Sequence, residues 1–89
     1  MKHVLFYELA EGAMALAQQH YPAHRERIDA FHGRGLMLLV GTFSDAPVGA
    51  MAVFSTREAV EEFMADDPFL RHGVVGAHRV REWDEVLQP

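Results

Sequence analysis

The sequence contains no cysteine and no apolar run as long as a membrane span. Without cysteine there are no disulfides, no thiol chemistry and no cysteine-ligated zinc sites. This composition is typical of a reducing compartment, so we expect a cytoplasmic protein. A helix that crosses a bilayer needs ~20 apolar residues, so we expect no contact with a membrane. The N-terminal segment MKHVLFYEL is too short and too soon polar to be a signal peptide.

Basic residues are also few: the chain has 8 Lys and Arg against 13 Asp and Glu, and its formal net charge is −5. Binding to nucleic acid needs clustered cations, so we expect no nucleic-acid partner. The chain of 89 residues is 49% hydrophobic and 24% charged, which is typical of one folded domain, residues 1–89. A domain of this size buries only about 60% of its unfolded surface and is marginal as a monomer.

The first half of the chain predicts a strand followed by helix. Lys2–Glu8 is rich in β-forming residues and predicts the first strand. Helix-forming residues follow, and we expect Pro22 to divide them into a short turn over Ala13–His20 and a helix that carries the proline in its first turn. The segment Gly33–Gly35 ends this helix, because glycine readily adopts the left-handed cap conformation.

The second half begins with a predicted hairpin. Two apolar runs, Leu36–Val40 and Val48–Phe54, flank the turn residues GTFSDAP. Ser55 lies three residues before Glu58, which is the spacing of a capping box and predicts the start of a second helix.

The last part of the chain predicts a short capped turn and a final strand. Asp67 directly precedes Pro68, the pattern of an N-cap followed by proline at the first helical position, and the turn ends at Gly73. Val74–Trp83 predicts the last strand. The complete order is βαββαβ, a ferredoxin-like α+β fold in which a four-stranded antiparallel sheet carries two helices on one face.

The two central apolar runs predict a partner for the sheet. They are apolar at nearly every position instead of alternating, as in strands that are buried on both faces. Two helices cover only one face of the sheet. We therefore expect a homodimer in which a second copy of the chain covers the other face.

His24 is the most informative titratable residue. It shares the i, i+4, i+7 stripe of the predicted helix with Ile28 and Phe31, so its imidazole should point toward the apolar side. A carboxylate beside it would fix the tautomer that general acid/base chemistry requires, and Asp67 is the candidate. Two structural alternatives stay open: a helix histidine that hydrogen-bonds a structural partner, and an aspartate that only caps a helix.

Three segments carry a family resemblance over nearly the whole chain: PAHRERIDAFHGRGLMLLVG (Pro22–Gly41), the helix that begins STREAVEEF, and DDPFLRHGVV (Asp66–Val75). With the histidine on the first helix and the Asp-Pro before the last strand, the chain resembles the YCII-related (YciI-like) family of small dimeric α+β barrel proteins. The resemblance implies a ligand pocket with a His–Asp pair, which maps onto His24 and Asp67.

Five further residues are expected to line this pocket as substrate-binding residues. Thr42 and Ser44 can orient a bound hydroxyl, although turn chemistry alone would explain both. His72 follows the Asp-Pro turn, and Phe69 is the aromatic residue that directly follows the Asp-Pro pair. Tyr21 stands where many relatives have an arginine, which implies weaker binding of anionic substrates.

We expect no metal and no cofactor. His20 and His24 have the i, i+4 spacing of a metal pair, but Pro22 lies between them and no further pattern completes a ligand set. No phosphate-binding glycine motif and no nucleophile elbow is present.

Three functions are compatible with the sequence. The first is a cofactor-independent lyase or isomerase that acts on hydroxylated aromatic or carbonyl compounds, because one relative is a dehydrochlorinase of a chlorinated hydroxyquinol. The second is a non-catalytic, dimeric module that binds a small ligand, and the third is a structural protein. By analogy of scaffold alone, the cofactor-free oxygenases of quinone-type antibiotics are a further enzyme option. We rank the enzyme first.

Overall fold

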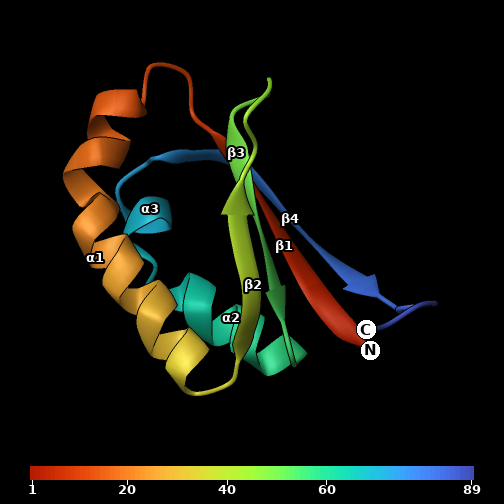
Figure 1. The fold of residues 1–89 in the computed structure, drawn as a ribbon. Helices are drawn as coiled ribbons and strands as arrows, with labels where there is room; N and C mark the ends of the chain where they lie inside the picture. The colour runs from red at the N-terminus through yellow and green to blue at the C-terminus, as the bar shows by residue number, and fades with distance from the viewer.

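In the computed structural model, which describes Met1–Pro89, four antiparallel strands form one sheet in the order β2-β3-β1-β4. The strands are β1 (Lys2–Leu9), β2 (Met37–Thr42), β3 (Gly49–Phe54) and β4 (Val75–Trp83). The helices are α1 (Met14–Gly33), α2 (Arg57–Ala65) and the single-turn α3 (Pro68–Arg71). Figure 1 shows all three helices on one side of the sheet. The predicted ferredoxin-like βαββαβ fold is confirmed.

The core lies between the sheet and the helices. Side chains alternate along the central strands, so every second residue of β1 and β3 points toward the helices. Phe63 of α2 is the centre of an aromatic cluster, with its ring edge-on to Phe31 at 5.2 Å and tilted against Phe54 at 5.5 Å between ring centroids. The buried core residues are Leu5, Tyr7, Ile28, Phe31, Met37, Ala52, Phe54, Ala59, Val60 and Phe63.

The expectation that Pro22 divides the first helix is wrong, because α1 is continuous from Met14 to Gly33 and contains Pro22. A proline inside a helix loses one hydrogen bond to the carbonyl four residues earlier, here that of Gln18. Both residues are exposed, so water can reach the orphaned carbonyl. None of the helices, α1 included, is long and apolar enough to cross a bilayer.

The predicted start of the second helix is also displaced by one residue. Thr56, not Ser55, is the N-cap of α2, and its Oγ1 accepts a hydrogen bond from the Ala59 amide at 3.1 Å. The Ser55 hydroxyl instead donates to the carbonyl of Leu36. The capping-box spacing of Ser55 and Glu58 therefore located the helix correctly but not its first residue.

The two predicted helix ends are confirmed. α1 ends at Gly33, and Gly35 takes the left-handed conformation with φ +76°. After α3, Gly73 does the same with φ +74°. Asp67 is the N-cap of α3 and Pro68 occupies its first turn, as the Asp-Pro pattern predicts. This cap places the Asp67 side chain at the junction of α2 and α3, under α1.

Arg27 joins the two long helices. Its guanidinium donates to the carbonyls of Phe63 at 3.1 Å and Glu62 at 2.6 Å, which lie in the last turns of α2. Carbonyls near a helix C-terminus lack partners within the helix, so a side chain from elsewhere must supply them. The same guanidinium lies 4.9 Å from the centroid of the Phe31 ring, in a cation–π contact.

We expect Arg27→Ala to lower the free energy of unfolding by about 1.5–3 kcal/mol, because two carbonyls lose a charged donor at a part-buried site. Urea denaturation followed by circular dichroism measures the change. Arg34→Ala is the matched control: Arg34 also contacts the Phe31 ring, at 5.3 Å from its centroid, and forms an exposed ion pair with Glu62, but it caps no carbonyl of α2. Its loss should therefore cost much less. Equal losses in the two variants would contradict the capping role.

Candidate functional site

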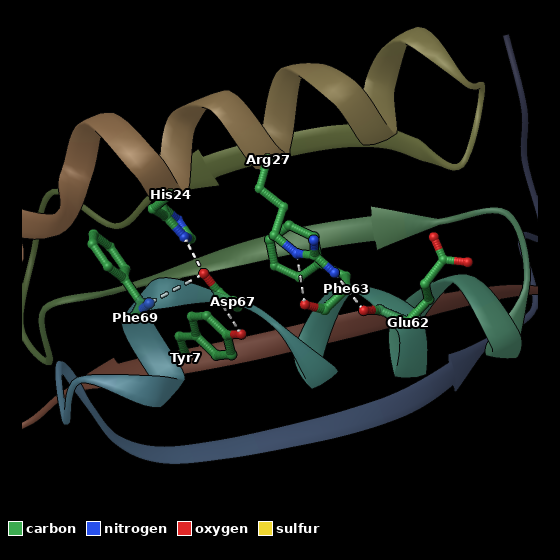
Figure 2. Close-up of polar contacts among 7 residues, drawn as sticks. All are labelled: Tyr7, His24, Arg27, Glu62, Phe63, Asp67 and Phe69. Atoms are coloured by element: carbon green, nitrogen blue, oxygen red, sulfur yellow. Dashed lines mark hydrogen bonds and ion pairs between the residues drawn. The ribbon is translucent and has the colours of Figure 1, made fainter.

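Three residues from three elements meet beneath α1 (Figure 2). His24 comes from α1, Tyr7 from β1, and Asp67 from the N-cap of α3. The Nδ1 atom of His24 lies 2.6 Å from Oδ1 of Asp67, and the hydroxyl of Tyr7 donates to Oδ2 of Asp67 at 2.6 Å. The structure therefore brings together the histidine and aspartate that the sequence singled out, and adds a tyrosine.

The Asp67 carboxylate is fully buried, with 0% of the residue exposed. A buried carboxylate is stable only when donors replace its lost water. Asp67 receives three: the Tyr7 hydroxyl on one oxygen, and on the other the His24 ring nitrogen and the backbone N–H of Phe69 at 3.2 Å. The same side chain thus caps α3 and holds the imidazole.

This environment defines the tautomer of His24. Because the Asp67 carboxylate only accepts, Nδ1 of His24 carries the hydrogen and Nε2 keeps the lone pair in the neutral ring. No protein group hydrogen-bonds Nε2. The only fully buried side-chain nitrogen or oxygen without a partner is Nδ1 of His3, so Nε2 of His24 retains access to solvent. An imidazole with one nitrogen fixed and the other free is the arrangement used to accept and return a proton.

Aromatic rings enclose the rest of the imidazole. Phe69 stacks on His24 with ring centroids 3.7 Å apart and planes within 6° of each other. Phe63 lies edge-on to His24 at 6.1 Å. His24 itself is only 7% exposed. Its edge, rather than its face, is therefore the part that a small molecule can approach.

Tyr7 is the residue of this site that the sequence interpretation missed. Burial raises the pKa of its phenol far above the ordinary value, and the hydrogen bond to the Asp67 carboxylate raises it further. Tyr7 therefore stays protonated and serves as a permanent donor to Asp67. The available signal was its inward position on a central strand, since a buried tyrosine hydroxyl needs a partner.

A cavity of about 250 Å³ lies beside this cluster. Tyr7, Tyr21 and Phe69 form part of its wall, and Thr42 lies at its edge. The ring of Tyr21 is tilted, 6.4 Å from that of His24. His24 is not part of the wall, because Phe69 covers its face. An apolar cavity of ~150 Å³ is enough to hold benzene, so this one can hold a substituted ring.

The structure does not bring Ser44 and His72 to the cluster. Ser44 is exposed in the loop between β2 and β3. His72 follows α3 and stacks on His20 of α1, with ring centroids 3.9 Å apart. No three His, Asp or Glu side chains are placed to hold a metal ion.

We expect Tyr7→Phe to lower the free energy of unfolding at pH 7 by about 1–3 kcal/mol, because a buried carboxylate loses a donor. The free energy of unfolding of the variant should also fall less steeply at alkaline pH than that of the parent. A phenol whose pKa is raised in the folded state stabilises the fold below the unfolded pKa near 10, and this contribution is lost as the pH rises above that value. Denaturation series at pH 7 and from pH 10 to 11.5 measure both effects.

The exposed tyrosine Tyr21 provides the control for this experiment, since Tyr21→Phe should leave both the stability and its alkaline decline close to those of the parent. A Tyr7→Phe protein with the parent's stability at pH 7 would show that the hydroxyl does not support Asp67.

Two proteins of known structure share this fold over almost the whole chain. The first is 5-chloro-2-hydroxyhydroquinone dehydrochlorinase from Burkholderia phenoliruptrix AC1100, in complex with 2,5-dihydroxybenzoquinone, with 18% identity, 94% of each chain covered and a TM-score of 0.80. The second is SnoaB, a cofactor-independent oxygenase from Streptomyces nogalater, with 15% identity, coverage of 99% of this chain and 96% of that chain, and a TM-score of 0.53. At these identities the likeness establishes the fold alone.

No curated protein sequence matches the chain. The sequence profile of the YCII-related domain matches residues 1–84. This match spans every helix and strand, including the segments that hold His24 and Asp67, and it confirms the resemblance inferred from the motifs. The chain therefore belongs to the YCII-related domain family.

Proposed function

We propose that this protein is a cofactor-independent lyase or isomerase in which His24 is the general acid/base and Asp67 holds it. The observation that carries the proposal is that the two ring nitrogens of His24 have different surroundings. Its Nδ1 is bound to a buried carboxylate, and its Nε2 is unpaired and reaches solvent. A buried imidazole held by a carboxylate on one nitrogen and open on the other is the arrangement of a general acid/base.

The chemical step uses only proton transfer. Nε2 of His24 removes a proton from a hydroxyl or an activated C–H of the substrate, and the electron pair of that bond forms a new double bond. In a lyase a leaving group departs with its electron pair, and the imidazolium gives its proton to that group or to water. In an isomerase His24 returns the proton to a different atom. In both cases Asp67 stabilises the imidazolium that forms, and such proton transfer contributes typically 10²–10⁴-fold to a rate.

The size of the cavity and the family support a small ring as substrate. The structurally similar dehydrochlorinase is named for a chlorinated hydroxyhydroquinone and its structure contains 2,5-dihydroxybenzoquinone. The cavity here has the volume for a molecule of that size. Tyr21, Phe69 and Thr42 line the cavity and are the substrate-binding residues of this proposal.

We expect His24→Gln to reduce turnover of a hydroxylated aromatic or carbonyl substrate by about 10²–10⁴-fold, because glutamine keeps a hydrogen bond to Asp67 but cannot shuttle a proton. Steady-state kinetics on a substrate found by screening measures the loss. His78→Gln, at an exposed histidine of β4, is the matched control and should turn over at the parent's rate. Turnover that survives in His24→Gln would refute the catalytic role.

A non-catalytic ligand-binding module is the second candidate. The stacking of Phe69 on His24 favours it, because that ring separates the imidazole from the cavity. This alternative predicts saturable binding of a small ring with no conversion on prolonged incubation. Product formation would reject it.

We also infer that two copies of the chain pair through the open sheet face. The helices leave this face uncovered (Figure 1). Four apolar residues, Val4, Phe6, Met51 and Trp83, line a shallow cavity there, and the charged Arg81 and Glu82 complete its rim. A largely apolar sheet face of this kind is stable when a second layer covers it. The cytoplasmic location expected from the lack of cysteine likewise stays a prediction.

We expect the parent protein to be a dimer at micromolar concentration and Met51→Glu to be a folded monomer, because a buried charge at the paired face costs more than the interface supplies. Light scattering after size-exclusion chromatography measures the mass. Ala30→Glu adds the same charge at an exposed position of α1 and should stay dimeric. A monomeric parent protein would contradict the pairing.

A further inference from the structure

The cavity beside the His–Asp pair is apolar, small and open at one edge. Ten of its fourteen lining residues are hydrophobic, and its volume is about 250 Å³. Three apolar residues of its wall are themselves well exposed to solvent: Met14 at 51%, Tyr21 at 46% and Val48 at 48%. Exposed apolar side chains gathered around a cavity mark an entrance for an apolar molecule.

The cavity wall contains no positively charged residue. Glu8 is the only charged residue that lines it, and no lysine, arginine or histidine does. Glu8 forms no ion pair, since none of the ion pairs in the structure includes it. An anion placed in the cavity would therefore lose its water without meeting a cation, which is costly.

The arginine of α1 that lies nearest to the cavity is engaged outside it. Arg25 lines a neighbouring groove that shares Tyr21 and Thr42 with the cavity. Its guanidinium donates to the Asp29 carboxylate at 3.0 Å and to the Tyr21 hydroxyl at 3.3 Å. Arg25 is therefore held on the groove side of Tyr21 and does not supply a free positive charge to the cavity.

The wall of the cavity offers almost no polar surface. Gln18 and Thr42 are the uncharged polar residues that line it besides glycine and tyrosine, and they do so mainly through their carbon atoms. A charged group that entered the cavity would therefore give up its water without meeting a fixed polar partner.

We propose that this cavity selects an uncharged, ring-sized molecule and rejects its charged analogues. The inference rests on the proposed function only in taking this cavity as the ligand site. It goes beyond that function by fixing the charge of the ligand.

Three nearly isosteric probes test the selection: benzamide, which is neutral, benzoate, which is anionic, and benzamidine, which is cationic. Binding is measured by titration of amide NMR chemical shifts in the parent protein. We expect benzamide to bind with shifts at cavity residues such as Ala17 and Tyr21 and at least about tenfold more tightly than either charged probe. Benzoate or benzamidine binding as tightly as benzamide would overturn the proposal, and so would the failure of all three to bind.

A single added charge provides the matched test. Gln18→Lys places a cation on the cavity wall, whereas Gln19→Lys adds the same charge at the next residue, which is exposed and does not line the cavity. We expect benzoate affinity to rise at least about threefold in Gln18→Lys and to stay unchanged in Gln19→Lys. Equal gains in both variants would mean that the overall charge, and not the cavity, governs binding, and would overturn the proposal.

The outcome is separable from that of the proposed function. The probes are titrated into the parent protein and involve no turnover, so their result does not depend on whether His24 acts as a base. Loss of turnover in His24→Gln together with selective benzamide binding by the parent protein supports both proposals. Retained turnover in His24→Gln refutes the catalytic role and leaves the selection of an uncharged ligand to be judged by the three probes.

Discussion

The burial of one carboxylate, that of Asp67, governs the arrangement of this protein's centre. The group has no contact with water, so the fold must supply donors to both of its oxygens. They come from three elements: the Tyr7 hydroxyl on β1, the His24 ring on α1 and the backbone N–H of Phe69 on α3. The sheet and the first and last helices are therefore joined at a single side chain, and none can shift without exposing a buried charge.

The structural and the chemical interpretations of this centre share atoms. Asp67 caps α3 and fixes the tautomer of His24 through the same oxygen. A substitution of Asp67 therefore disturbs stability and chemistry together. His24 differs, because the fold uses only its Nδ1 and leaves Nε2 unpaired. The histidine is thus the residue at which a catalytic role can be separated from a structural one.

The sequence predicted those features that depend on neighbours in the chain. The β-rich composition of the first strand, the Asp-Pro cap of α3 and the helical stripe that turns His24 inward are all local patterns, and each was found. The contact of Tyr7 with Asp67 joins residues 60 positions apart, and no local pattern signals it. Pro22 was misjudged because its cost depends on exposure, which the local sequence does not report. A pocket was expected only from the family resemblance, and three of its five expected lining residues, Tyr21, Thr42 and Phe69, line the cavity. Its shape was not predictable from local patterns, since its wall combines residues of β1, β2, β3, β4, α1 and α3.

The one turn of α3 couples the cavity to the imidazole. The Phe69 ring covers one face of His24 and forms part of the cavity wall, while its backbone N–H holds Asp67. Two parallel ring stacks, His24 on Phe69 and His20 on His72, fasten α3 to α1. A displacement of α3 would at once uncover the imidazole face, change the cavity wall and remove a donor from Asp67. Access to His24 and the geometry that activates it are therefore not independent variables in this fold, because both depend on where α3 lies.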